Sequence, residues 1–117
     1  MLAAGGVTKD GVRILSRESI DKMRKPMLDE KIVHEAAKYY QGYSYGLGVR
    51  TMIDKEKCGA KSPIGEFGWD GAAGAYMFVD VENNLSLFYA QQIRNCARCY
   101  DIIHPTLRDL TYECLGI

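Results

Sequence analysis

The chain has 117 residues, and its 15 Lys and Arg are balanced by 15 Asp and Glu, which gives a formal net charge of zero. This length suits one domain and excludes two domains of ordinary size. The neutral balance argues against a nucleic-acid-binding face, which needs clustered cationic side chains, and no apolar run is long enough to cross a membrane.

Helices are predicted in the first third of the chain. Residues 1–4 predict the last turn of a helix that stops at two glycines. Ser16 is an N-cap for a helix that runs to about residue 25, and Asp29 caps a second, short helix. The apolar positions of this second helix are Ile32, Val33, Ala36, Ala37 and Tyr40. Because a domain seldom begins with a helix end, we expect residues 1–117 to be a single partial domain, the C-terminal segment of a longer one.

Strands are predicted in the remainder of the chain, followed by a helix. Alternating side chains and turn residues predict strands over residues 43–52, 67–69, 75–81 and 85–91. Residues 54–62 are charged and predict a mobile connection. A helix begins at Pro105, and its predicted apolar face is formed by Leu107, Leu110, Cys114 and Leu115. This order predicts an α+β fold, with an antiparallel sheet of three or four strands and the C-terminal helix packed on it.

Two short motifs match the active-site patterns of serine enzymes. Residues 42–46 read Gly-x-Ser-x-Gly around Ser44, with Asp101 and His104 later in the chain. A nucleophile elbow lies between a strand and a helix, whereas a strand is predicted to follow this motif, so a hydrolase centred on Ser44 is the least favoured reading. Ser19-x-x-Lys22 lies on a short helix with charged neighbours, which indicates a solvated face and not a desolvated lysine base.

The four cysteines predict neither a disulfide framework nor a metal site. Cys96 and Cys99 form a single Cys-x-x-Cys pair, whereas structural zinc needs four ligands. His34 and His104 are far apart in the sequence, so we expect no metal and no cofactor. Arg98 between the two thiols lowers their expected pKa, so a redox role stays open. Reduced thiols, and the lack of a signal peptide in this chain, favour a cytoplasmic location.

The most informative stretch is residues 67–76, where bulky Phe67 and Trp69 are followed by four tiny residues. Tiny residues let a ligand or another backbone approach closely. With three further segments, this stretch resembles the C-terminal part of the β-lactamase-related serine hydrolases. That family includes class C β-lactamases, penicillin-binding proteins and esterase-like enzymes. The further segments are residues 45–48 (Tyr-Gly-Leu-Gly), 76–80 (Tyr-Met-Phe-Val-Asp) and 82–85 (Glu-Asn-Asn-Leu).

The resemblance implies a set of site residues. The family's third active-site motif, Lys-Thr-Gly or Trp-Gly-Gly, falls on Trp69, Asp70 and Gly71, which are the implied substrate-binding residues. The next residue, Ala72, is implied to supply a backbone N–H to the oxyanion hole. Trp69 replaces the lysine that would hold a carboxylate, and Asp70 adds negative charge. These departures favour an esterase or an unknown hydrolase over a β-lactamase, and a small-molecule ester or amide substrate is expected only in a full-length context.

The family's nucleophilic Ser-x-x-Lys and its Tyr-x-Asn have no counterpart here in a matching context. We therefore expect this chain to be inactive alone, and whether it functions within an enzyme is left undecided. Its expected partners are the missing N-terminal part of the hydrolase domain or a second copy. The alternative is a non-catalytic interaction module or remnant that associates through its sheet edge and its helix-docking face. If the motif assignment is right, residues 67–80 form a strand that is bent or interrupted near residues 71–74, pair antiparallel with residues 85–91, and leave the Ala72 N–H unbonded.

Overall fold

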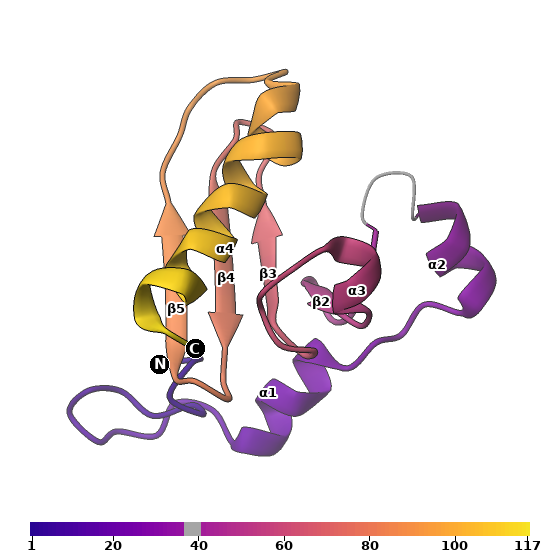
Figure 1. Ribbon diagram of the computed structural model, residues 1–117. Coiled ribbons are helices and arrows are strands. Elements are labelled where there is room, and N and C mark those ends of the chain that lie inside the picture. The colour runs from indigo at the N-terminus through magenta and orange to yellow at the C-terminus, as the bar shows by residue number, and fades with distance from the viewer. Residues whose placement is uncertain (37–40) are drawn as a thin grey trace.

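The computed structural model describes residues 1–36 and 41–117 and has the predicted α+β architecture (Figure 1). Its single sheet is antiparallel, and its five strands lie in sequence order. The strands are β1 (Tyr43–Tyr45), β2 (Arg50–Met52), β3 (Phe67–Asp70), β4 (Tyr76–Asp80) and β5 (Leu85–Tyr89). The helices are α1 (Arg17–Arg24), α2 (Glu30–Ala36), α3 (Lys55–Cys58), the π-helical turn η1 (Cys99–Ile103) and α4 (His104–Leu115).

The sheet has one strand more than the largest number predicted, because residues 43–52 form a hairpin and not a single strand. β1 and β2 pair with Tyr45 opposite Arg50. The chain reverses between them, where the Gly46 N–H donates to the Val49 carbonyl at 2.9 Å. Gly48 has a φ of +75°, which a glycine adopts without steric cost.

Residues 67–80 also form a hairpin, so the prediction of one interrupted strand is wrong. β3 and β4 are neighbouring antiparallel strands, with Phe67 opposite Val79. Between them the Gly71 N–H donates to the Ala75 carbonyl and the Gly74 N–H to the Gly71 carbonyl, both at 2.8 Å. These bonds close a tight turn over residues 71–75. The predicted antiparallel pairing with β5 is correct, but it is made by β4 alone.

The N-terminal segment keeps the geometry of a helix end, although it is a turn. The N–H groups of the two predicted stop glycines donate to the carbonyls of Leu2 and Met1, which is the Schellman pattern. The Ser16 hydroxyl then caps α1 by accepting from the Ser19 N–H at 3.0 Å. α1 buries Ile20 completely, and this side chain joins the larger of the two hydrophobic clusters. The buried members of that cluster are Ala3, Ile20, Phe67, Val79 and Val81.

The short helices α2 and α3 are both capped by aspartates. The Asp29 carboxylate accepts from the Ile32 N–H at 2.9 Å, as predicted, while Ala37 and Tyr40 lie outside the described residues. Residues 54–62, predicted to be a mobile connection, contain α3, which Asp54 caps by accepting from the Lys57 N–H at 3.0 Å. Within the described ranges, no helix has the length and apolar character needed to cross a bilayer.

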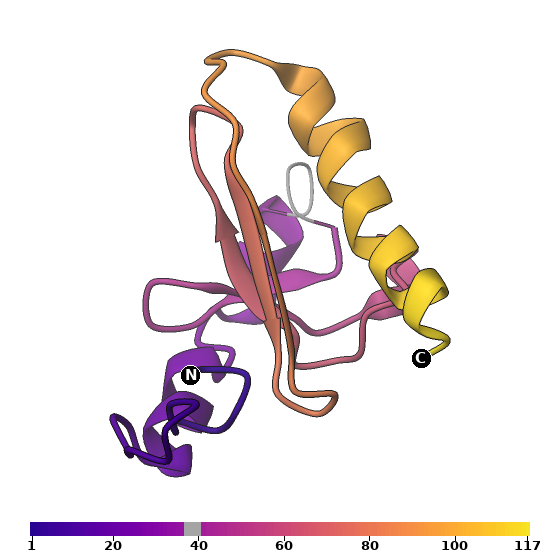
Figure 2. The same ribbon diagram turned by 90° about the vertical axis from the view of Figure 1, so that its left-hand side faces the viewer.

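The C-terminal helix packs on the opposite face of the sheet from α1, as Figure 2 shows with the sheet nearly edge-on. Its predicted apolar face is wrong: Leu110 and Leu115 are 47% and 55% exposed. The buried side chains instead recur every four residues and are His104, Arg108 and Tyr112. Each has a ring or an aliphatic stem that packs under the sheet and a polar tip that finds a hydrogen-bond partner, so hydropathy alone does not identify this face.

Candidate functional site

The turn that joins β3 to β4 presents a free backbone donor. Ala72 lies at the exposed tip of this turn. Among the hydrogen bonds of residues 1–36 and 41–117, none uses the Ala72 N–H. Its neighbours are held: the N–H groups of Gly71 and Gly74 bond within the turn, and the Ala73 carbonyl accepts from the Ile93 N–H at 2.9 Å. An exposed N–H in a fixed turn can donate to an anionic oxygen.

Two side chains from the C-terminal helical region, those of Tyr100 and His104, hydrogen-bond to carbonyls of the turn over residues 71–75. The Tyr100 hydroxyl donates to the Gly71 carbonyl at 3.0 Å, and the His104 Nε2 lies 2.9 Å from the Gly74 carbonyl. Because a carbonyl only accepts, His104 carries its proton on Nε2. The imidazole also stacks on the Tyr76 ring at 4.6 Å. Burial lowers the pKa of His104, which favours this neutral form.

Trp69 lies on the face of the sheet that carries Phe67, opposite to the face covered by α4. It is 40% exposed and makes an edge-on ring contact with Tyr45 at 5.3 Å. Met77 is its cross-strand partner, and Phe88, which is 74% exposed, is the partner of Met77. Cross-strand partners share one face of a sheet. Trp69, Met77 and Phe88 therefore form an apolar row that crosses the sheet from β3 to the edge strand β5.

Asp70 points to the other face and is not brought together with Trp69. Its carboxylate is buried and forms an ion pair with the Arg50 guanidinium. That guanidinium lies between the rings of Tyr43 and Tyr76, 4.9 and 5.0 Å from their centroids. The negative charge of Asp70 is therefore compensated inside the protein, and the expected repulsion of anionic substrates by this residue has no basis on the Trp69 face.

A second buried carboxylate, Glu66, lies in the same polar layer. Its Oε2 accepts from the Ser62 hydroxyl at 2.8 Å and from the Tyr43 hydroxyl at 3.2 Å. Burial raises the pKa of Glu66 because desolvation disfavours the charged carboxylate. Arg108 of α4 donates to the same Tyr43 hydroxyl at 3.2 Å. This layer joins the sheet to α4.

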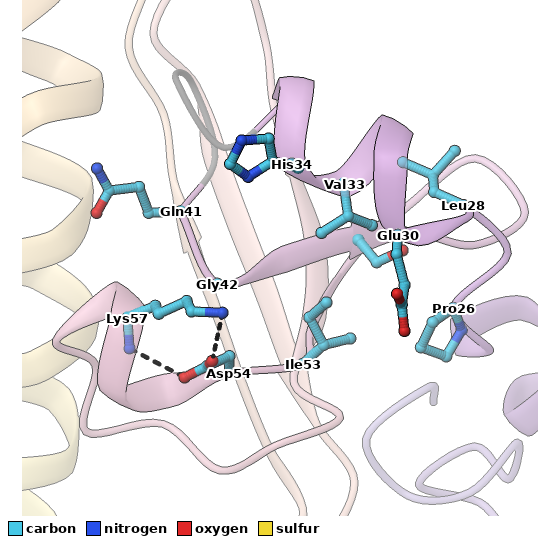
Figure 3. Close-up of a pocket in the computed structure, with 11 residues that line it drawn as sticks. Pro26, Leu28, Glu30, Val33, His34, Gln41, Gly42, Ile53, Asp54 and Lys57 are labelled. Atoms are coloured by element: carbon cyan, nitrogen blue, oxygen red, sulfur yellow. Dashed lines mark hydrogen bonds and ion pairs between the residues drawn. The ribbon is translucent and has the colours of Figure 1, made fainter.

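A cavity of about 660 Å³ lies beside the Gly-x-Ser-x-Gly motif, between α2, β1 and α3. Figure 3 shows His34 and Val33 of α2 on one side, and the ion pair of Asp54 with Lys57 on the other. Ser44 also lines it, is 1% exposed and has a hydroxyl with no hydrogen-bond partner among the described residues. It lies within β1, so it is not on a strand-to-helix turn.

The other sequence candidates are not assembled into a site. The predicted partners of Ser44, Asp101 and His104, line a different cavity beneath α4. Ser19 hydrogen-bonds to Ser16 on the exposed side of α1, and Lys22 is ion-paired with Glu18 at 2.8 Å in solvent. In the part of the chain that the structure describes, no group of three or more potential metal ligands is found, and all four cysteines are free thiols.

Sequence reasoning missed the residues that support the turn. From the sequence, His104 is considered only as a partner of Ser44 and as a metal ligand, and Tyr100 and Arg50 are given no role. The sequence signal for His104 is the row of His104, Arg108 and Tyr112 at intervals of four, which places three polar tips on one helical face.

The chain is similar in sequence to part of two curated proteins of Mycobacterium tuberculosis. Protein Rv1367c of strain H37Rv and the uncharacterized protein MT1414 of strain CDC 1551 are each 35% identical to it over 94 residues. The aligned region covers 75% of this chain and 23% of each relative. The chain thus spans about a quarter of the length of these relatives. No protein-family model matches it.

Solved structures of low sequence identity share its fold. EstCE1, a hydrolase with promiscuous acyltransferase activity, superposes with a TM-score of 0.72 at 19% identity, over 95% of this chain and 26% of its own. The LovD6 mutant of simvastatin synthase from Aspergillus terreus gives a TM-score of 0.70 at 18% identity, over 88% of this chain and 30% of its own. The chain therefore adopts part of the β-lactamase-like fold, and fold by itself does not give function.

Proposed function

We propose that this chain is the C-terminal part of a serine hydrolase or acyltransferase domain, in which it supplies the third-motif strand and one oxyanion-hole donor. The observation that carries the proposal is the Ala72 N–H, which is exposed and unbonded within the described residues. It follows Gly71, the first residue of the turn after β3. Its turn is fixed by Tyr100 and His104, so this donor is preorganised.

The chemistry that these residues suit is acyl transfer. When a serine hydroxyl attacks an ester or amide carbonyl, the carbonyl oxygen gains negative charge, and a fixed N–H stabilises that charge. Trp69 offers an aromatic wall beside this position instead of a cation. With Asp70 neutralised by Arg50 on the other face, the site suits a neutral ester or amide better than a substrate that must be held by its carboxylate.

The first test uses the isolated chain. We expect no turnover of p-nitrophenyl esters or of a chromogenic cephalosporin, and no labelling by a fluorophosphonate. Ser19 lies on the exposed side of α1 and Ser44 lies within β1, and neither environment is that of an activated nucleophile. Stoichiometric labelling at Ser44 would instead support an independent hydrolase at that residue. Labelling at Ser19 would identify the exposed Ser-x-x-Lys as a working pair.

The second test places the hairpin in an active enzyme. Residues 67–80 replace the structurally equivalent hairpin of EstCE1, and ester hydrolysis is measured. The Ala72→Pro change removes the N–H and should lower kcat by on the order of 10²–10³-fold. Ala72→Ser keeps the N–H and is the matched control, which should retain the activity of the chimera. Equal activity of the two variants would refute the role of this donor.

The alternative is a non-catalytic module that associates through its surface. The specific observation in its favour is the apolar row that ends in Phe88, which is 74% exposed on the edge strand β5. A chimera that hydrolyses esters through Ala72 would favour the hydrolase reading, whereas an inactive chimera that folds normally would favour the module.

A further inference from the structure

Cys96 and Cys99 lie together at the start of the C-terminal helical region, beside the turn of residues 71–75. Cys96 is half-buried and directly precedes the helical residues, whereas Cys99 is completely buried. The Cys99 N–H donates to the Cys96 carbonyl at 3.0 Å, so the two residues close a single turn. Residues three apart on a helical turn have their Cβ atoms about 5–6 Å apart, which is near the range that a disulfide spans after a small adjustment.

The two thiols have unequal environments. A hydrogen bond from the Cys99 side chain lowers the pKa of Cys96, and the same interaction raises the pKa of Cys99. Cys96 also precedes the positive end of a helix, which favours a thiolate. The Gln91 side-chain amide donates to the Cys99 sulphur at 2.9 Å. An accessible thiolate followed by a buried thiol is the arrangement in which the first sulphur attacks and the second resolves.

We propose that Cys96 and Cys99 form a reversible dithiol–disulfide pair that exchanges with low-molecular-weight disulfides and whose redox state alters the turn of residues 71–75. The Cys96 thiolate attacks one sulphur of such a disulfide, forms a mixed disulfide and releases one thiolate. Cys99 passes its proton to the released thiolate, attacks the Cys96 sulphur, closes the intramolecular disulfide and releases the second thiolate. One small disulfide is thereby reduced to two thiols, and the two cysteines are oxidised.

The coupling to the turn rests on direct packing. A Cβ placed on Gly74 would lie 3.1 Å from the Cys99 sulphur and 3.2 Å from the Gln91 side-chain amide, so these groups pack against the Gly74 backbone. The adjacent Tyr100 holds the Gly71 carbonyl. Drawing the Cys99 sulphur toward Cys96 breaks its bond from Gln91 and removes an atom from beside Gly74. The proposal goes beyond the hydrolase reading, and it holds or fails without any catalytic activity.

The experiment equilibrates the full chain in mixtures of glutathione and glutathione disulfide, then traps free thiols with iodoacetamide. Peptide mass spectrometry should find residues 96 and 99 joined, with two hydrogens lost and no alkylation, in the more oxidising mixtures. The emission of Trp69, the only tryptophan, and the amide exchange of residues 71–75 should change with the same midpoint.

Cys96→Ser and Cys99→Ser should each abolish both changes, while Cys114→Ser, at an exposed position of α4, should abolish neither. Four outcomes would overturn the proposal. These are a pair that stays fully alkylated in every mixture, a disulfide mapped to Cys58 or Cys114, a glutathione adduct that Cys99 never resolves, and oxidation without any response of Trp69 or of the turn amides.

Discussion

At the scale of single residues, His104 should make the stability of the protein depend on pH. Burial lowers the pKa of His104 in the folded state, so its stabilising contribution is complete above its unfolded pKa of about 6.5 and is lost as the pH falls through the folded value. We expect the urea midpoint of the wild type to fall between pH 7.5 and pH 5.5, which are about one unit above and below that pKa. His104→Gln should show a smaller fall. His34→Gln, at the exposed second histidine, is the control and should behave like the wild type.

The ion pair between Arg50 and Asp70 makes a second prediction at this scale. Asp70→Ala leaves the buried guanidinium between the Tyr43 and Tyr76 rings without its carboxylate, and should cost about 3–5 kcal/mol of unfolding free energy. The double change Arg50→Met with Asp70→Leu removes both charges and should cost less than Asp70→Ala alone. Urea unfolding of the wild type, of Asp70→Ala and of the double variant measures both costs. A double variant less stable than Asp70→Ala would contradict the assignment of a compensating pair.

At the scale of the elements, Gly68 sets how closely β3 approaches β4. A Cβ on Gly68 would lie 2.1 Å from the Met77 carbonyl oxygen and 2.8 Å from the Phe78 Cα, both backbone atoms that have no rotamer to change. Gly68→Ala should therefore destabilise the protein by about 1–3 kcal/mol, as overpacking does. Gly71→Ala is the matched control, because its nearest contacts lie at 3.9 Å. Thermal unfolding followed by circular dichroism compares the two, and equal midpoints would show that the strand contact is looser than described.

The sequence predicted the helices and strands better than the turns that connect them. The Ser16 and Asp29 caps were correct because capping is local chemistry. The residue 43–52 hairpin was missed because side chains go on alternating through the turn at Gly46 and Gly48. The buried face of α4 was missed because its residues carry polar tips, while the more apolar leucines of the helix face solvent.

The candidate site was predictable only in part, and for a similar reason. The position of Ala72 came from a resemblance in chain order, which is local information. The pairing of Asp70 with Arg50 depends on which strands are neighbours and which face each side chain takes. Neither is determined until the register is known. The contact of the Gly74 carbonyl with His104 spans 30 residues, so no sequence window contains both partners.

At the scale of the whole molecule, the exposed apolar row should drive self-association. Phe88 and Trp69 are 74% and 40% exposed on one face, and β5 is an edge strand. Exposed apolar surface and unpaired edges promote pairing between copies. We expect oligomers at micromolar concentration by light scattering, and Phe88→Ser should reduce them. Val12→Ser, at a residue that is 56% exposed elsewhere in the chain, is the control. A wild type that stays monomeric through this range would contradict the prediction.

The place of α4 after all five strands has a consequence for biosynthesis. Its side chains reach back to groups made much earlier: Arg108 to Tyr43 across 65 residues and Tyr112 to Asp80 across 32. During synthesis the strands therefore emerge before the helix that supplies these partners. The sheet must wait for residues 104–115 before these long-range contacts can form. A stop codon before Tyr112 would leave this waiting state permanent, and the sheet would be exposed to proteases and chaperones.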